Sequence, residues 1–128
     1  MMVADTDVLI DFLAGHEPTA QRVARELERE SLTTTVITRF ELLCGARHAR
    51  QEDTIRQLLD VLPTLPLHQD AADQAARARL ELERAGQSIG MADSLIAGIV
   101  LAHHGILLTR NRRHFERVTG LQLADVLT

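Results

Sequence analysis

A short apolar segment at the N-terminus of this chain runs directly into two carboxylates, and this feature constrains the fold more than any other. Val3 and Ala4 suit a buried strand, and the apolar residues within 8–13 recur at helical spacing. The sequence therefore predicts a strand, an acidic turn and a helix. Asp5 would lie at the carboxyl end of the strand, which is the edge where open α/β sheets bind their ligands.

The two acids of this turn have different interpretations. Asp7 is placed to be the N-cap of the following helix, an ordinary stabilising role worth about 1 kcal/mol, although a chemical role stays open. Asp5 caps no helix in this interpretation. Burying its carboxylate would therefore cost free energy unless a cation or a hydrogen-bond donor contacts it. We therefore expect Asp5 to be functional.

The remaining chain alternates between strand and helix patterns without repeats, linkers or low-complexity segments. We expect further strands at 32–37, 62–67, 106–109 and 121–123, with the prolines of 62–67 placing that strand at a sheet edge. We expect an exposed amphipathic helix starting at Pro18, helices from Thr38 and after a polar break at 49–53, a helix over 70–85, a buried helix over 91–102 and a helical turn over 111–117. This alternation predicts an α/β fold with three layers and a mainly parallel sheet of about five strands.

Composition limits the class of protein. At 128 residues and 45% hydrophobic content, the chain is expected to form one domain, residues 1–128, with a single core. It has no apolar run of the roughly 18 residues that a membrane span needs and no secretion signal, so we expect a soluble cytoplasmic protein. The one cysteine, Cys44, excludes an internal disulfide and is expected to be a packed thiol.

The charges are unevenly distributed. A formal net charge of −4 argues against a strongly basic nucleic-acid-binding protein, but every basic residue other than histidine is arginine, and four of them lie together. This cluster consists of Arg110, Arg112, Arg113 and Arg117. Trp and Tyr are absent, so contacts to a nucleic-acid backbone are expected rather than stacking on bases.

Two further carboxylates are candidates for chemistry. Glu41 follows Thr38 by three residues, which is the spacing of a helix capping box and supplies a purely structural explanation. Asp93 begins an otherwise apolar helix, where an unpaired buried charge costs several kcal/mol. If Asp5, Glu41, Asp93 and Asn111 converge at one sheet edge, their oxygen atoms and mutual repulsion favour Mg²⁺ or Mn²⁺ as the ligand.

The chain resembles the PIN-domain ribonucleases, and among them the VapC-type toxins of toxin-antitoxin pairs. The resemblance extends over almost the whole chain. The matching segments are DTDVLID at 5–11, ITRFEL at 37–42 followed by Gly45, IGMADSLIA at 89–97 and LTRNRRHF at 108–115. The family often has a fourth acid where this chain has Asn111.

The resemblance implies a three-layer α/β/α PIN-like domain and a metal-dependent endoribonuclease. It implies metal ligands at Asp5, Glu41 and Asp93, with Asn111 a further catalytic residue, and it implies an antitoxin partner and a homodimer. The residues expected to orient ligands or water are Thr6, Asp7, Ser94 and Thr109, and the arginine cluster is expected to bind RNA.

Two alternatives stay open. A PIN-like module that binds RNA or a protein without cleaving would retain the fold, and Asn111 favours it, whereas the retained acids argue against it. The Asp5-Thr6-Asp7 segment also resembles the start of haloacid-dehalogenase-like phosphohydrolases, but the later lysine and closing acidic pair of that class are missing.

Overall fold

Within residues 1–127, which the computed structural model describes, strands and helices alternate along the chain. The strands are β1 (Met2–Ala4), β2 (Leu32–Thr35), β3 (Thr64–Leu65), β4 (Ile106–Leu108) and β5 (Gln122–Ala124). The helices are α1 (Thr6–Ala14), α2 (Thr19–Glu28), α3 (Val36–Cys44), α4 (Ala49–Val61), α5 (Gln69–Arg84), α6 (Met91–Ala102) and α7 (Arg112–Phe115). None of these helices is long and apolar enough to cross a membrane.

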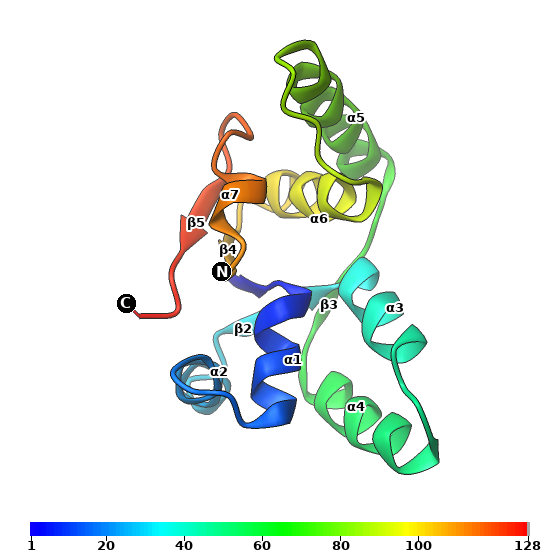
Figure 1. The fold of residues 1–128 in the computed structure, drawn as a ribbon, viewed down its shortest axis with the longest axis vertical. Coiled ribbons are helices and arrows are strands. Elements are labelled where there is room, and N and C mark those ends of the chain that lie inside the picture. The colour runs from blue at the N-terminus through cyan, green and yellow to red at the C-terminus, as the bar shows by residue number, and fades with distance from the viewer. Residues whose placement is uncertain (128) are drawn as a thin grey trace.

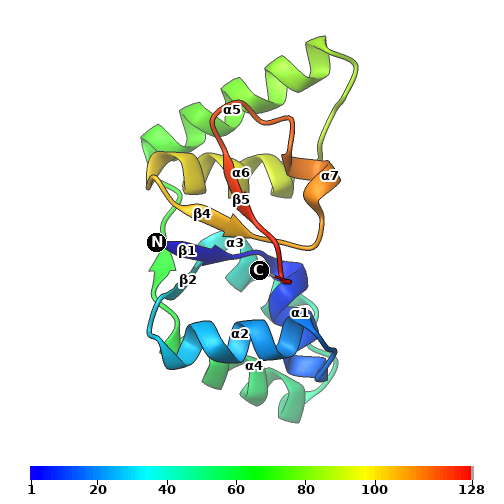
Figure 2. The same ribbon diagram turned by 90° about the vertical axis from the view of Figure 1, so that its left-hand side faces the viewer.

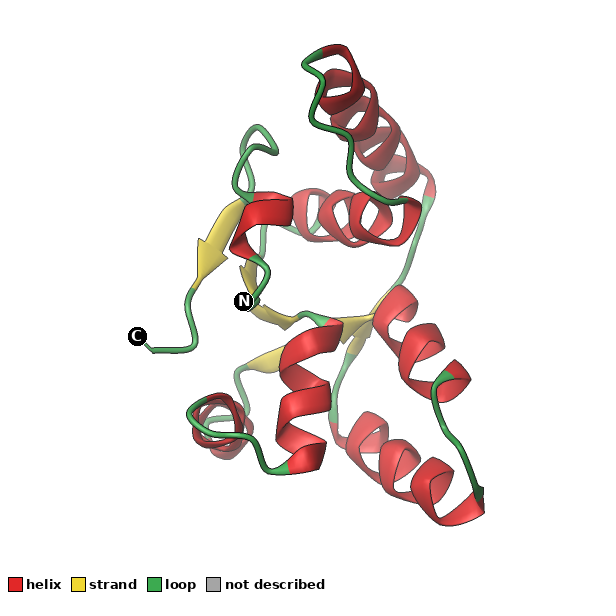
Figure 3. Ribbon diagram, in the orientation of Figure 1, coloured by secondary structure: helices red, strands yellow, loops and turns green. Residues whose placement is uncertain are grey.

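The strands form one parallel sheet in the order β3-β2-β1-β4-β5. β1 lies in the middle, with Met2 opposite both Leu32 of β2 and Ile106 of β4. β3 is at an edge, as its flanking prolines predicted. The sheet runs between two groups of helices (Figures 1 and 3), which confirms the predicted α/β fold.

Alternate residues of the central strands pack on opposite faces of the sheet. Val3 and Leu107 contribute to the core under α5, α6 and α7, whereas Ala4 and Leu108 contribute to the core formed with α1, α2, α3 and α4. This division follows from the two-residue repeat of a strand. Figure 2 shows α5 and α6 on one side of the sheet and α1, α2 and α4 on the other.

Two helices begin earlier than the sequence predicted. The β-branched run was expected to stay extended through Ile37, but the helix begins at Val36 because the Thr35 hydroxyl accepts a hydrogen bond from the amide of Thr38 at 3.1 Å. The polar segment 49–53 was expected to be a break. It is instead the first turn of α4, capped by His48, whose ring accepts from the Gln51 amide at 3.2 Å.

Two predictions of exposure were also wrong. The helix starting after Pro18 was expected to be exposed on its polar face, but Arg22 and Glu26 of α2 are buried. Their side chains form an ion pair with 3.3 Å between Arg22 Nε and Glu26 Oε1. Cys44 was expected to be packed, and it is exposed at the end of α3.

The predicted helix over 91–102 matches α6, and its small residues explain how closely it packs on α5. A side-chain carbon at Gly98 would lie 2.6 Å from the Cβ of Ala75 and closer still to the carbonyl oxygen of Ala71. Only glycine allows this separation of the two helices. The packing fixes the start of α6, and with it Asp93, relative to the sheet.

Candidate active site at the carboxyl edge of the sheet

Asp5 follows β1 directly and is almost completely buried, with 3% of its surface exposed. Its Oδ1 accepts a hydrogen bond from the Thr6 amide at 2.8 Å, and its Oδ2 accepts one from the Thr109 hydroxyl at 2.7 Å. Asp5 is therefore the N-cap of α1. The predicted assignment of the cap to Asp7 was wrong because the helix begins at Thr6, immediately after the strand.

Asp7 lies in the first turn of α1 and turns toward the segment after β4. Its Oδ2 accepts a hydrogen bond from the backbone amide of Arg110 at 3.0 Å. Its Oδ1 is buried and has no hydrogen-bond partner within residues 1–127. A buried carboxylate oxygen without a donor is costly, so this atom is suited to a cation or another ligand.

The environment of these two acids disfavours their charged forms. Burial raises the pKa of Asp5 to about 7, and the neighbouring charge of Asp7 and, to a smaller extent, that of Asp93 act in the same direction. The hydrogen bonds from Thr109 and Thr6 oppose the rise in this pKa. Burial also raises the pKa of Asp7. A bound cation would relieve the repulsion that keeps a proton on this pair.

The side chain of Glu41 is hydrogen-bonded to Thr6, which follows Asp5 at the carboxyl edge of the sheet. The Thr6 hydroxyl donates to Glu41 Oε1 at 2.6 Å and lies 3.0 Å from the Thr38 hydroxyl. The predicted capping box of Thr38 and Glu41 was wrong, because Thr35 caps α3 and Glu41 lies beyond its first turn. The hydrogen bond from Thr6 thus holds the carboxylate of Glu41 beside the start of α1, next to Asp5 in the sequence.

Asp93 lies in the first turn of α6, as predicted, but its carboxylate has a partner. His114 Nδ1 lies 2.9 Å from Asp93 Oδ2, and the Asp93 side chain is 28% exposed. Because a carboxylate only accepts, the ring nitrogen carries the hydrogen. The expectation of a buried and unpartnered charge was therefore wrong. Ser94 donates to the carbonyl of Met91 at 2.7 Å, so its hydroxyl is bonded within its own helix.

Thr109 and Asn111 follow β4 at this edge. The Thr109 hydroxyl donates to Asp5 and accepts from the Asn111 amide at 2.9 Å, so it holds the turn after β4 against the start of α1. Asn111 is exposed. Its carboxamide makes no hydrogen bond within the part of the chain that the structure describes, so its predicted role stays a prediction.

The predicted arginine cluster divides into two pairs. Arg110 Nε lies 2.6 Å from Asp11 Oδ2, and one Arg112 nitrogen lies 3.0 Å from Asp125 Oδ1. The side chains of Arg113 and Arg117 have no ion pair or hydrogen bond within residues 1–127, and both line a pocket of about 310 Å³ that includes Asp93. Two of the four guanidinium groups are therefore available to a ligand.

Two partners of the site were missed at the level of sequence. Asp11 is buried and binds Arg110, and its four-residue separation from Asp7 on one helix was the signal that both acids share a face. The contact between His114 and Asp93 joins residues 21 positions apart and had no local signal.

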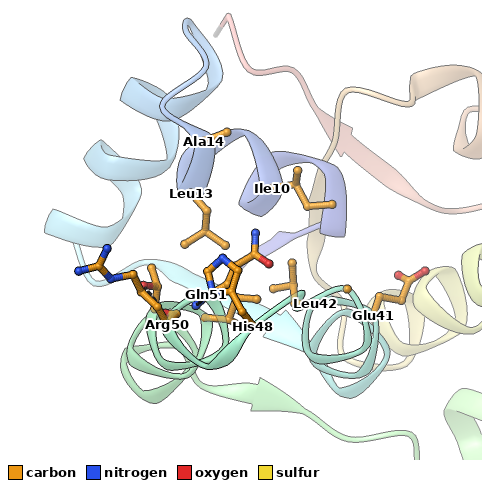
Figure 4. A pocket seen from close by; sticks show the side chains of 11 residues that line it. Ile10, Leu13, Ala14, Glu41, Leu42, His48, Arg50 and Gln51 are labelled. Atoms are coloured by element: carbon orange, nitrogen blue, oxygen red, sulfur yellow. Dashed lines mark hydrogen bonds between the residues drawn. The ribbon is translucent and has the colours of Figure 1, made fainter.

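An apolar groove of about 470 Å³ begins next to Glu41 and runs between α1, α3 and α4. Figure 4 shows Ile10 and Leu13 pointing into it from α1, with Glu41 at one end and Arg50 at the other. The acids are thus flanked by an apolar groove beside Glu41 and by the arginine-lined pocket beside Asp93.

The donor set fits a hard divalent cation in charge and in atom type, because it offers carboxylate oxygens alone, including the unpartnered oxygen of Asp7. The acids are not closed into a cage. Within residues 1–127, no three Asp, Glu, His or Cys side chains stand close enough together to hold an ion without adjustment.

Residues 2–121 match the family model described as the PIN domain, and the chain belongs to the PIN-domain family. It is 30% identical to the tRNA(fMet)-specific endonuclease VapC of Shigella flexneri over 125 residues, which cover 94% of each chain. These findings confirm the family that the sequence motifs indicated.

Solved structures show the same fold. The DNA-bound VapBC of Salmonella typhimurium superposes with a TM-score of 0.85 at 25% identity, over 98% of this chain and 97% of that chain. VapBC-5 of Mycobacterium tuberculosis, a member of the VapBC family of toxin-antitoxin systems, superposes with a TM-score of 0.58 at 25% identity, over 73% of this chain and 79% of that chain.

Proposed function

We propose that this protein is a divalent-metal-dependent endoribonuclease that acts as the toxin of a type II toxin-antitoxin pair. The observation that carries the proposal is that three acids act at the start of α1: Asp5 follows β1, Glu41 accepts a hydrogen bond from Thr6, and the charge of Asp93 helps to raise the pKa of Asp5. Membership of the PIN family and likeness to VapC ribonucleases support it. We propose the cytoplasm as its site of action, because cellular RNA is present there.

In this proposal, Asp5, Glu41 and Asp93 hold Mg²⁺ or Mn²⁺. When held by these residues, a divalent cation would supply an activated water and would stabilise negative charge on the scissile phosphate. Thr109 and Thr6 orient the carboxylates of Asp5 and Glu41 through their hydroxyl groups. Asp7 adds negative charge beside Asp5, and the exposed carboxamide of Asn111 supplies a neutral oxygen.

The arginines after β4 supply the positive charge that brings the RNA to these acids. Arg113 and Arg117 contact phosphates directly, because nothing within residues 1–127 occupies their guanidinium groups. Arg110 and Arg112 add to the positive potential while Asp11 and Asp125 hold them in place. Backbone contacts of this kind make RNA binding salt-dependent.

The antitoxin is proposed to occupy the apolar groove between α1, α3 and α4 (Figure 4), with an arginine reaching Glu41 at its end. Leu13→Arg would place a charge in the groove and is expected to abolish capture by the cognate antitoxin while leaving RNA cleavage intact. Unchanged capture in a pull-down experiment would contradict this placement.

A homodimer is also proposed, because large apolar side chains such as Phe40 and Met91 are 66% and 63% exposed. Burying them against a second copy would remove apolar area from water. Light scattering at micromolar concentration should give twice the mass of one chain, and a monomer would contradict the dimer.

The test of the enzymatic proposal is cleavage of RNA by the purified protein with Mg²⁺ or Mn²⁺, using total tRNA and unstructured RNA as substrates. Asp93→Asn removes one charge without changing volume, so it should lower the rate at least about 100-fold with an unchanged melting temperature. Wild-type cleavage by Asp93→Asn at saturating metal would contradict the role of Asp93.

A non-catalytic PIN-like module is the second candidate. The amide of Asn111 at the position where the family often has an acid favours it, whereas the retained Asp5, Glu41 and Asp93 argue against it. RNA binding without cleavage at any metal concentration would establish this alternative. Membership of the PIN family argues against the phosphohydrolase alternative.

A further inference from the structure

The pocket beside Asp93 lies between the loop that joins α5 to α6 and the segment that contains α7. Its lining includes Leu82 of α5, the loop residues 87–90, and Arg113 and Arg117. Its volume of about 310 Å³ is at the lower end of the range of about 300–1,000 Å³ that is usual for small-molecule sites. A pocket of this size accommodates one nucleotide rather than a helix or a folded loop.

The lining of the pocket includes Asp93, which is paired with His114, and two arginines that have no partner within residues 1–127 and supply its positive charge. Arg110 and Arg112, which are close in sequence, are each bound to a carboxylate of this chain, at 2.6 and 3.0 Å. Arg113 and Arg117 are exposed at the pocket, and neither forms an ion pair within residues 1–127, although Asp93 lines the same pocket. A guanidinium group binds phosphate oxygens in a bidentate manner, so this wall suits a phosphodiester.

The opposite wall combines apolar and hydrogen-bonding groups. Leu82, which is 5% exposed, and the half-buried Ile89 both line the pocket, and Ile89 supplies most of the aliphatic surface that a ring could contact. The Gln87 amide donates to the carbonyl of Leu82 at 2.8 Å, which fixes the loop. The side chains of Gln87 and Ser88 make no hydrogen bond within the described residues, so they are available to the edge of a base.

We infer that this pocket binds one unstacked nucleotide of the RNA, adjacent to the phosphate that is cleaved. Arg113 and Arg117 would hold its phosphate, Leu82 and Ile89 would pack on its base, and Gln87 would read the base edge. Sequence-specific proteins commonly recognise single-stranded RNA through bases that are splayed out of the stack. The inference rests on the proposed ribonuclease function and adds the subsite that selects the cleavage position.

The role of Arg113 and Arg117 in holding the phosphate is tested by measuring RNA binding under conditions that prevent cleavage. Labelled single-stranded RNA hexamers are titrated in EDTA, so that no cleavage occurs, and the Kd is measured by fluorescence anisotropy at several salt concentrations. The Arg113→Ala/Arg117→Ala variant should bind at least about tenfold more weakly and with a shallower salt dependence. The control Arg56→Ala/Arg77→Ala also removes two exposed positive charges, from the pairs that Arg56 forms with Glu52 on α4 and Arg77 with Glu81 on α5, and should leave the Kd unchanged.

The role of Gln87 in reading the base is tested by measuring the base preference of RNA binding. Wild-type protein should distinguish hexamers that differ at one position, and Gln87→Ala should reduce the ratio of their Kd values by about tenfold with little change in the average Kd. In NMR titrations with AMP, GMP, CMP and UMP, the amide signals of Ser88, Ile89 and Gly90 should shift. An unchanged Kd in the double arginine variant, or an unchanged base preference in Gln87→Ala, would overturn the inference.

The two proposals fail separately. If wild-type protein cleaves RNA while the pocket variants bind and select RNA as wild type does, the nucleotide subsite is wrong and the ribonuclease proposal stands. If nucleotides shift the loop signals but no metal supports cleavage, the ribonuclease proposal falls, and the pocket binds a nucleotide without selecting a cleavage position. Melting temperatures of all variants should match wild type, because the substituted side chains are exposed.

Discussion

The carboxyl group of Asp5 makes the stability of the metal-free protein depend on pH. Its pKa is raised to about 7 in the folded chain from an ordinary value of 3.8, first by burial and then by the charge of Asp7. Between these values the folded state binds more protons than the unfolded state, so stability falls as pH rises. The stabilising contribution is complete below pH 4 and is lost as pH passes 7, with a magnitude of at most about 4 kcal/mol.

Urea unfolding in EDTA at pH 5 and pH 8 measures this effect. We expect the free energy of unfolding attributable to Asp5 to be lower at pH 8, and Mn²⁺ at pH 8 to restore stability because the cation replaces the proton. Asp5→Asn is the control, since it cannot ionise and should flatten the difference between the two pH values. An equally steep difference in Asp5→Asn would contradict the assignment to Asp5.

Asn111 offers a second test at the scale of one residue. Its side chain is exposed and makes no hydrogen bond within the described residues, so it is unrestrained at the site. Asn111→Asp adds a negative ligand and should raise Mn²⁺ affinity about tenfold, whereas Asn111→Ala should lower activity less than Asp93→Asn does. Calorimetric titration of Mn²⁺ decides the point, and equal affinity in Asn111→Asp and wild type would mean that Asn111 does not face the ion.

At the scale of elements, the contact between α5 and α6 depends on Gly98. A side-chain carbon there would overlap the backbone of α5 at Ala71 and Ala75, and backbone cannot move aside as a flexible side chain can. Gly98→Ala should therefore destabilise the fold by about 3 kcal/mol. Gly90→Ala is the comparison variant: among the described residues no atom lies within 4 Å of the added carbon, so the substitution should cost only about 1 kcal/mol, from a poorer N-cap for α6. Urea unfolding followed by circular dichroism should show this difference.

The elements themselves were mostly predictable, because their signals are local. The apolar helix over 91–102 was located to the residue, and the prolines around β3 placed it at the sheet edge. The start of α3 was not predictable. The run of β-branched residues favours a strand through Ile37, and what ends β2 is the hydrogen bond from the Thr38 amide to the Thr35 hydroxyl.

At the scale of the whole molecule, the sequence predicted that the acids converge but not how they are held. The hydrogen bonds from Thr109 to Asp5 and from Thr6 to Glu41 join residues 104 and 35 positions apart. Such pairings depend on the strand order, which periodicity does not contain. Glu41 was consequently assigned to a local capping box, whereas the cap of α1 was assigned to Asp7 for a local reason, because the helix begins two residues earlier than Asp7 would require.

The end of the chain is joined to α2 by a buried charge network, which yields the last prediction. Arg22 donates to the carbonyl of Asp125 at 2.7 Å and lies 3.3 Å from Glu26, and both side chains are less than one-tenth exposed. Glu26 also accepts a hydrogen bond from the Ser31 hydroxyl at 2.6 Å.

Arg22→Met leaves the carboxylate of Glu26 buried without its arginine partner, so this variant should lose about 3–5 kcal/mol of the free energy of unfolding. Arg22→Met/Glu26→Leu removes both charges and should recover most of this loss. Arg77→Met, which breaks an exposed pair on α5 with Glu81, should cost less than about 1 kcal/mol. Urea unfolding of the three variants compares these costs, and a double variant less stable than Arg22→Met would mean that the network contributes more than compensation of buried charge.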